Sequence, residues 1–321
     1  MSAQGLGIAV ACIHTIGALL AEAEGNLKEA GIEQPALEAA WLLEHGLELS
    51  PLMQRVSPER QVTAAEWASV QALVARRAKR EPLQYVLGTQ EFCGREFRVT
   101  PSVLIPRPES ELLVEEAVRR CNESFQATVV DVGTGSGCLA VSVAAALPAA
   151  RVLAIDVSPQ ALAVARVNMV QHGVEGRIEC FCGDLLSPLR EHIPENQVDV
   201  ILANPPYIAE SDWMTLQPEV RGFEPRLALA GGRDGLDLHR RLLQQAPAYL
   251  KPGGVLLMEV GLGQAALVCR QAEESGCFRV YDVLRDEGGI HRVVCLERKS
   301  DGLEFQGCGA PTQLIELNRH S

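Results

Sequence analysis

The sequence predicts an α/β protein in which a doubly wound, mostly parallel sheet follows a small helical domain. After Pro108, short apolar runs alternate with helical stretches, a pattern typical of a parallel sheet with helices on both faces. Before Gly88 the apolar spacing is helical and shows no strand-like alternation. The chain has 321 residues, of which 47% are hydrophobic, and this length is sufficient for two domains with their own cores.

The first half, from about Thr15 to Gly88, is predicted to be helical. Pro35 occupies a plausible first helical turn, and Thr63 with Glu66 forms a capping box that opens a later helix. Cations suit the negative end of a helix dipole, so we interpret the basic residues that end this helix as helix-end chemistry and not as a nucleic-acid patch. These residues are Arg76, Arg77, Lys79 and Arg80.

The second half is predicted to form the sheet. Glu91–Val99 alternates around Cys93 and Gly94 and predicts a hairpin that links the two halves. The predicted parallel strands are Thr128–Val132, Val152–Ile155, Ile178–Phe181, Val198–Ala203 and Val255–Val260, with helices such as Pro159–His172 and Leu236–Tyr249 between them. Arg279–Leu284 and Arg292–Leu296 are expected to close the domain as an antiparallel pair.

These patterns divide the chain into four segments. We predict a helical domain at 1–88, a hairpin linker at 89–105, the sheet domain at 106–298 and a poorly ordered tail at 299–321. Residues 1–54 hold one basic residue, Lys28, which argues against a targeting segment. The apolar run Leu6–Ile13 is shorter than a membrane span requires.

Composition restricts the partners and the compartment. The net charge of −12 disfavours tight non-specific binding to nucleic acid, because that affinity comes from Lys and Arg. The 7 His form no ligand cluster, so no metal is predicted. Cys180 and Cys182 lie in a strand-like stretch where they face opposite ways, and we interpret them as reduced, buried thiols. Reduced cysteines and the absence of an export signal indicate the cytoplasm.

A glycine-rich turn follows the first predicted strand of the sheet. Glycines at alternate positions allow a ligand to approach the main chain where the strand ends and a helix begins. The residues of this turn are Gly133, Thr134, Gly135, Ser136 and Gly137. Asp156 ends the next strand and can accept hydrogen bonds from ribose hydroxyls, and Asp184 can accept from an adenine amino group. The glycines alone leave NAD and S-adenosylmethionine open, and the two acids favour a nucleoside-type cofactor.

The motif Asn204-Pro205-Pro206-Tyr207 follows the fourth strand and predicts the reaction site. An amide nitrogen is a poor nucleophile, so two acceptors aimed at its N–H bonds are needed to direct its lone pair at an electrophilic methyl. The side-chain oxygen of Asn204 and the carbonyl of Pro205 can be these acceptors. The prolines stiffen the loop, and Tyr207 offers a ring for stacking on a planar amide or base.

Several motifs together resemble class I S-adenosylmethionine-dependent methyltransferases, and within them the release factor glutamine N5-methyltransferase family. The resemblance covers about residues 15–297. Besides the Asn-Pro-Pro-Tyr site, it rests on the segments Arg80–Gly88, Phe92–Gly94, Leu104–Glu111, Glu224–Leu229 and Gly231–Leu236. It implies a class I methyltransferase fold, with a seven-stranded sheet and an N-terminal helical domain that helps to bind the protein substrate.

The resemblance also implies an activity and site residues. The expected reaction is methyl transfer from S-adenosylmethionine to the glutamine of the Gly-Gly-Gln loop in bacterial class 1 release factors, with no nucleic acid or membrane partner. The turn Gly133–Gly137, with Asp156, Leu185 and Asn204, is expected to contact the cofactor, and Asn204–Tyr207 to hold the glutamine. Leu185 departs from members of the family that have an aromatic residue beside the adenine.

Three alternatives stay open at the level of sequence. A sister enzyme with the same motif methylates a glutamine of a ribosomal protein. An adenine N6-methyltransferase acting on DNA or RNA can use the same Asn-Pro-Pro-Tyr chemistry, although the charge of −12 counts against it. A catalytically silent cofactor-binding assembly protein is the third, and the intact Asn204 and Tyr207 argue against it.

Overall fold

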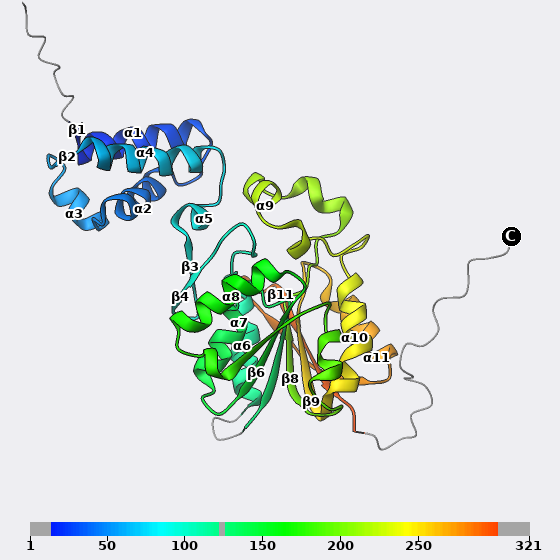
Figure 1. Cartoon of the computed structure of the whole chain (residues 1–321). Coiled ribbons are helices and arrows are strands. Elements are labelled where there is room, and N and C mark those ends of the chain that lie inside the picture. Colours follow the sequence, from blue (N-terminus) through cyan, green and yellow to red (C-terminus); the bar gives the residue numbers. More distant parts are fainter. Residues whose placement is uncertain (1–13, 122–125, 301–321) are drawn as a thin grey trace, which may run out of the picture.

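The computed structural model describes residues 14–121 and 126–300. Figure 1 shows the helical domain in blue apart from the sheet domain, with β3 (Thr89–Phe92) and β4 (Arg95–Arg98) between them. This antiparallel pair is the predicted hairpin, and it is confirmed. The predicted tail lies outside the described residues from position 301 onward, as do the first 13 residues. Among the described helices, none combines the length and the apolarity needed to cross a membrane.

The helical domain has its own core. Its elements are β1 (His14–Thr15), α1 (Ile16–Glu29), α2 (Pro35–Leu47), α3 (Pro51–Val56), β2 (Gln61–Val62), α4 (Ala64–Ala78) and α5 (Leu83–Leu87). The capping box of α4 is confirmed: Thr63 Oγ1 accepts from the Glu66 amide at 3.2 Å, and the Glu66 carboxylate accepts from the Thr63 amide at 2.7 Å. The expectation of no strand in this half was wrong in one detail, because the two-residue strands β1 and β2 pair.

The sheet domain contains the predicted seven-stranded sheet. Its strands are β5 (Thr128–Val132), β6 (Arg151–Asp156), β7 (Ile178–Cys182), β8 (Val198–Ala203), β9 (Leu250–Glu259), β10 (Phe278–Arg285) and β11 (His291–Arg298), in the order β10-β11-β9-β8-β5-β6-β7. β11 runs antiparallel to both of its neighbours, β9 and β10, which confirms the antiparallel closing pair. The strand order changes direction between β5 and β8. A crevice at the carboxyl ends of two such strands is where open α/β sheets bind ligands.

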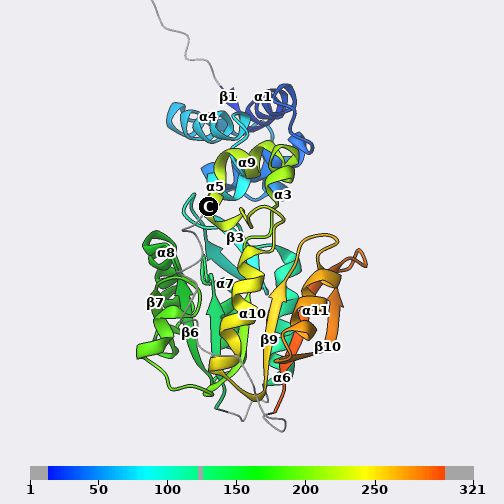
Figure 2. The same ribbon diagram turned by 90° about the vertical axis from the view of Figure 1, so that its right-hand side faces the viewer.

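Helices cover both faces of this sheet. The helices of the sheet domain are η1 (Pro108–Ser110), α6 (Glu111–Arg120), α7 (Cys138–Ala146), α8 (Pro159–Gln171), η2 (Glu175–Arg177), η3 (Ser187–Glu191), η4 (Glu210–Thr215), α9 (Pro218–Phe223), η5 (Arg226–Ala228), α10 (Asp237–Tyr249) and α11 (Ala265–Glu274). Figures 1 and 2 show α9 beyond the end of the sheet, next to the helical domain. Figure 2 shows α10 and α11 on one face of the sheet. Neighbouring strand residues alternate between the two cores: Val129 packs with α6, α7 and α8, whereas Val130 packs with α10 and α11.

The predicted burial of two cysteines was wrong. Cys182 is exposed and Cys180 is half-buried, because β7 is the edge strand and only one side of it is paired. Both are free thiols. The interpretation of the basic cluster as helix-end chemistry fits its contacts in part, since Arg76 pairs with Glu81 within the helical domain. Arg77 and Arg80 also reach α9 of the sheet domain.

Candidate active site

A cavity of about 290 Å³ opens at the carboxyl ends of the central strands. It brings together most of the residues that the sequence singled out, namely Gly133, Gly135, Asp156, Asp184, Leu185, Asn204, Pro205 and Pro206. The other four, Thr134, Ser136, Gly137 and Tyr207, do not line it. Segments far apart in the sequence therefore meet where the strand order reverses, as the doubly wound topology requires.

The buried carboxylate of Asp131 holds the glycine-rich turn by hydrogen bonds, and the sequence analysis gave this residue no role. Asp131 accepts from the Thr134 hydroxyl at 2.6 Å and from the Ala140 amide at 3.1 Å. Burial raises the pKa of Asp131 to about 7, although these hydrogen bonds lower it. Gly137 has a φ of +82°, and a side chain there would crowd Ala165 of α8. A carboxylate inside an apolar strand was the signal in the sequence that could have identified Asp131.

Asp156 supports the same turn from the end of β6. One carboxylate oxygen accepts from the Gly135 amide at 2.9 Å and the other from the Ser158 amide at 2.8 Å. Burial raises the pKa of Asp156, and the hydrogen bonds from the backbone oppose that shift. Each oxygen keeps a further lone pair, so Asp156 can hold the turn and accept from a ligand hydroxyl at the same time.

Asp184 and Leu185 lie on the next loop. Asp184 accepts from Arg241 of α10, and both side chains are largely exposed. Leu185 has a φ of +50°, is buried and lines the cavity. An aliphatic side chain therefore forms this part of the cavity wall. Arg241 also lines the cavity, and the sequence offered no signal for it because its partner is distant along the chain.

The Asn-Pro-Pro-Tyr loop is held by the segment that follows it. Ile208 pairs with Ala230 in an isolated parallel bridge. A Cβ on Gly231 would lie 2.6 Å from the Pro206 carbonyl oxygen, and one on Gly235 would lie 2.3 Å from the Tyr207 carbonyl oxygen. These glycines are needed for close approach, which explains why the Gly-Gly-Arg-Asp-Gly segment accompanies the loop.

The Asn204 side chain, at the cavity wall, begins a hydrogen-bond chain that runs into the core. Its Nδ2 donates to the Ser110 hydroxyl at 2.9 Å, and Ser110 donates to the Glu259 carboxylate at 2.5 Å. Ser110 and Glu259 are each 2% exposed. Burial, with Glu259 close by, raises the pKa of Tyr207 to about 12, so that side chain stays neutral. Sequence reasoning missed Ser110 and Glu259, although a glutamate ending an apolar strand was a visible signal.

The segment between the domains closes around this site. Glu224 accepts from the Ile105 amide at 3.2 Å and also from Arg107. The Tyr85 hydroxyl donates to the Val103 carbonyl at 2.6 Å, and Val103 lines the cavity. The hydrogen bonds thus join the Pro-Leu-Gln-Tyr, Ile-Pro-Arg-Pro and Glu-Pro-Arg-Leu segments to one wall of the site.

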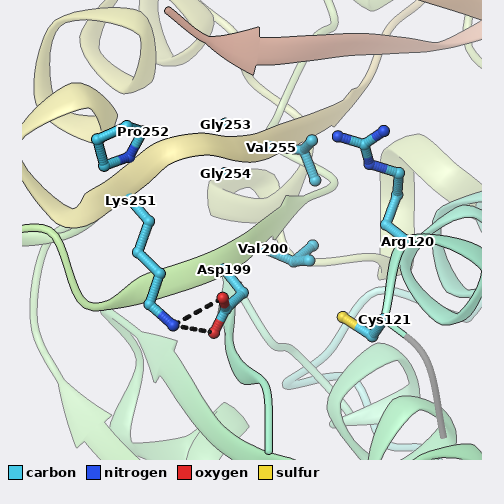
Figure 3. A pocket seen from close by; sticks show the side chains of 9 residues that line it. All are labelled: Arg120, Cys121, Asp199, Val200, Lys251, Pro252, Gly253, Gly254 and Val255. Atoms are coloured by element: carbon cyan, nitrogen blue, oxygen red, sulfur yellow. Dashed lines mark hydrogen bonds and ion pairs between the residues drawn. The ribbon is translucent and has the colours of Figure 1, made fainter. Parts of the chain in front are cut away.

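A second cavity of about 170 Å³ lies at the opposite end of β8 (Figure 3). Asp199, near the start of β8, pairs there with Lys251 at 2.7 Å. Arg120 pairs with Glu297. The charged groups compensate one another, and none of the predicted site residues is present. The chemistry is therefore concentrated in the first cavity.

Two family models match the chain. The PrmC N-terminal domain matches residues 18–88, and the methyltransferase small domain matches residues 108–217. These matches correspond to the helical domain and to much of the sheet domain.

Curated relatives span nearly the whole chain. The release factor glutamine methyltransferase of Geobacter sulfurreducens is 47% identical over 285 residues, covering 88% of this chain and 96% of that protein. That of Moorella thermoacetica is 40% identical over 287 residues, covering 89% and 100%. A solved methyltransferase from Pyrococcus furiosus is 16% identical with a TM-score of 0.50, covering 70% of this chain and 99% of that one, and this likeness concerns the fold alone.

Proposed function

The chain belongs to the release factor glutamine methyltransferase family, and on this premise we propose that it methylates the N5 atom of the glutamine in the Gly-Gly-Gln loop of class 1 release factors. S-adenosylmethionine is the proposed methyl donor. The observation that carries the proposal is the placement of Asn204 beside the glycine-rich turn in one cavity. The proposed substrate takes part in translation, so the proposed place of action is the cytoplasm.

The residues of the cavity fit S-adenosylmethionine. The turn at Gly133–Gly137 exposes main chain to a ligand, and a Cβ on Gly133 would meet open space. Asp156 has acceptor capacity for ribose hydroxyls, and Leu185 with Leu238 gives an apolar wall for a base. When bound, this cofactor supplies an electrophilic methyl on a sulfonium. Asp184 is the proposed acceptor for the adenine amino group, a role it has to share with its Arg241 contact.

The proposed mechanism rests on orientation of the target amide. The Asn204 carbonyl oxygen and the Pro205 carbonyl accept from the two N–H bonds of the glutamine, which holds the nitrogen lone pair toward the methyl. Pro206 stiffens the loop, and the neutral Tyr207 packs against the planar amide. No general base has to act before attack, because the nitrogen already carries a lone pair and loses its proton afterwards.

The protein substrate is proposed to contact both domains. The walls of the cavity include the linker residues Val103 and Leu104 and the exposed Leu227 of η5. An exposed leucine that lines the cavity suits contact with a protein loop. The helical domain is the proposed second contact, and we assign it to substrate binding and not to chemistry.

The test is methyl transfer from labelled cofactor to purified substrates, followed by mapping of the methyl. Release factor, ribosomal protein and nucleic acid should be compared at equal concentration. We expect a single methylated glutamine in the Gly-Gly-Gln loop. A methyl found only on a ribosomal protein glutamine or on adenine would assign the site to one of the alternatives. Absence of transfer to all three would favour a non-catalytic role.

A further inference from the structure

We propose that Ser110 and Glu259 are positioning residues that fix which face of the Asn204 amide meets the substrate. The inference rests on the proposed function and deepens it. It assigns a role to two side chains that do not line the cavity and lie behind the residue that does.

The three side chains come from separate parts of the sheet domain. Asn204 follows β8, Ser110 ends η1 at the start of α6, and Glu259 ends β9. The contacts of 2.9 Å and 2.5 Å make one continuous chain from the cavity wall into the core. A buried carboxylate is costly unless its hydrogen bonds are used, so its presence here calls for a role.

The direction of donation in this chain is decided by the carboxylate. An ionised carboxylate has no proton to give, so the single hydroxyl proton of Ser110 must point at Glu259. Ser110 can then only accept from Asn204, and the atom that faces it must be Nδ2. The carbonyl oxygen of Asn204 is thereby left for the cavity. Only this orientation offers an acceptor to the N–H of a substrate amide.

Charged groups on several elements surround Glu259. Burial is the main influence and raises the pKa of Glu259 to about 7. The hydrogen bond from Ser110 lowers this pKa, and the negative charge of Glu109 raises it further. The positive charges of Arg292 and Arg107 lower it. Arg292 is itself paired with Asp286 at 2.7 Å, and Arg107 with Glu224.

The neutral groups near the Glu259 carboxylate do not take over its role in setting the direction of the Ser110 hydroxyl. The Glu259 main-chain oxygen, and not its carboxylate, contacts the His239 ring at 2.8 Å. Burial lowers the pKa of His239, and Tyr207 is neutral as well. Ser110 is thus the hydrogen-bond donor that the structure gives to the Glu259 carboxylate within the described residues.

Protonation of Glu259 removes its control over the direction of the Ser110 hydroxyl. A protonated carboxyl can donate to Ser110, which frees the serine hydroxyl to donate to the Asn204 carbonyl oxygen. Both amide orientations are then allowed, and in one of them Nδ2 faces the N–H of the substrate. Turnover at saturating cofactor should therefore fall as pH drops through the pKa of Glu259. Any pH dependence of cofactor affinity in the same range belongs to Asp131 under the glycine-rich turn, whose pKa is also about 7.

The first experiment compares Ser110→Ala, Ser110→Thr and the matched control Ser142→Ala, a buried serine of α7 away from the site. We expect Ser110→Ala to lower kcat on release factor by about 10- to 100-fold, because a misaligned polar group at a reacting centre costs that order. The KM for the factor and the calorimetric Kd for the cofactor should change less than about threefold. Ser110→Thr should recover most of the turnover, and Ser142→Ala should resemble the wild type.

The second readout needs no turnover. In selectively ¹⁵N-asparagine-labelled protein, assigned by comparison with Asn204→Ala, the side-chain amide of Asn204 should exchange slowly with solvent in the wild type. Ser110→Ala should accelerate this exchange. Unchanged exchange and wild-type kcat in a folded Ser110→Ala protein would overturn the relay, as would a loss of kcat without any change in the amide signal.

Glu259→Gln keeps the inference testable if Ser110→Ala does not fold. A glutamine can both accept and donate, so this variant should show low kcat at all pH values and no fall between pH 8 and pH 6. Retention of the wild-type pH profile would refute the relay. The proposed function is tested separately: a wild-type protein that transfers no methyl to release factor contradicts the function, whereas the exchange of the Asn204 amide still decides the relay.

Discussion

At the scale of single residues, the site is built from polar groups whose partners restrict what each can do. Asn204 is orientated by a serine, and Asp156 is held by two backbone amides. Asp184 makes its contact with Arg241 at the surface. Preorganised groups such as Asn204 and Asp156 lose little freedom when the substrate binds. We therefore expect their mutation to have larger effects than mutation of Asp184.

Asn204→Ala should lower turnover by about 10²–10³, since it removes a preorganised contact to the reacting amide. Asn204→Asp keeps an acceptor of similar shape but cannot donate to Ser110, and it adds a charge near the Glu259 carboxylate. The structure therefore predicts that both variants fail alike. Single-turnover rates at saturating cofactor and release factor measure this. Substantially higher activity in Asn204→Asp would contradict the role of Nδ2, and wild-type turnover in Asn204→Ala would remove this residue from the mechanism.

The two acids proposed to bind the cofactor, Asp156 and Asp184, should differ in importance. Asp156→Ala removes an acceptor for the ribose and also the anchor of the Gly135 amide, so cofactor affinity should fall by roughly 10- to 100-fold. Asp184→Ala removes a largely exposed contact and should cost less than about fivefold. Calorimetric titration of both variants with cofactor measures the two losses of affinity. Equal losses, or none for Asp156→Ala, would contradict the assignment of the ribose contact.

At the scale of elements, α9 connects the segment after the Asn-Pro-Pro-Tyr loop to the helical domain. Glu219 of α9 pairs with Arg77 at 3.1 Å and with Arg80 at 2.8 Å. The Arg77 side chain is 7% exposed, the Glu219 side chain is 14% exposed, and Arg77 also pairs with Glu38 of α2 at 2.5 Å. Because α9 lies along the chain between the Asn-Pro-Pro-Tyr loop and the glycines that support it, this ion-pair cluster couples the helical domain to the segment that follows that loop.

Glu219→Ala should loosen that coupling. We expect a loss of about 1–3 kcal/mol in stability, because a partly buried arginine keeps only one carboxylate. The kcat/KM for intact release factor should fall while the cofactor Kd stays unchanged. The control is Glu210→Ala, an exposed glutamate of η4. Thermal unfolding and steady-state kinetics provide the measurements, and equal behaviour of the two variants would exclude a coupling role for Glu219.

The pH dependence of this cluster follows from its charges. Burial alone would raise the pKa of Glu219, but hydrogen bonds from the backbone, Arg80 and Arg77 leave it below the ordinary value of 4.5. A lowered pKa stabilises the folded state above the pKa of the unfolded chain, and that stability is lost as pH falls through the folded value. The cluster should therefore persist throughout the neutral range, so a fall in activity between pH 8 and pH 6 would not come from it.

At the scale of the whole molecule, two domains are joined by a linker that also forms part of the site. The helical domain buries its own apolar residues, and the cores of the sheet domain are separate clusters. Figure 1 shows that the connection runs through the hairpin β3–β4. Tyr85 and Val103 pack with α8 residues in a fourth cluster at this junction.

Removal of residues 1–80 should separate cofactor binding from substrate binding. Tyr85 and its hydrogen bond to Val103 remain in the truncated chain, so the cavity wall should survive. We expect cofactor affinity within about fivefold of the full chain and no detectable methylation of intact release factor. Calorimetry and methyl transfer measure the two properties. Full activity of the truncated protein on the intact factor would show that the helical domain does not bind the substrate.

The sequence by itself determined the order of the strand-like runs along the chain, and the locations of the turn at Gly133–Gly137 and of the loop at Asn204–Tyr207. Those features depend on local patterns: apolar alternation sets a strand, and glycine or proline sets the conformation where it ends. Element ends were less accurate, since β9 begins at Leu250 and not at Val255. There, pairing with β8 extends the strand beyond its apolar run.

The tertiary structure alone decided which side chains act together. Ser110 and Glu259 lie 149 positions apart, and Arg77 and Glu219 lie 142 apart, so no local periodicity relates the partners. The exposure of Cys182 likewise followed from the position of β7 at the sheet edge, which the strand pattern does not encode. Local sequence fixes backbone preference residue by residue, whereas hydrogen-bond direction and burial depend on what the rest of the chain brings to the same place.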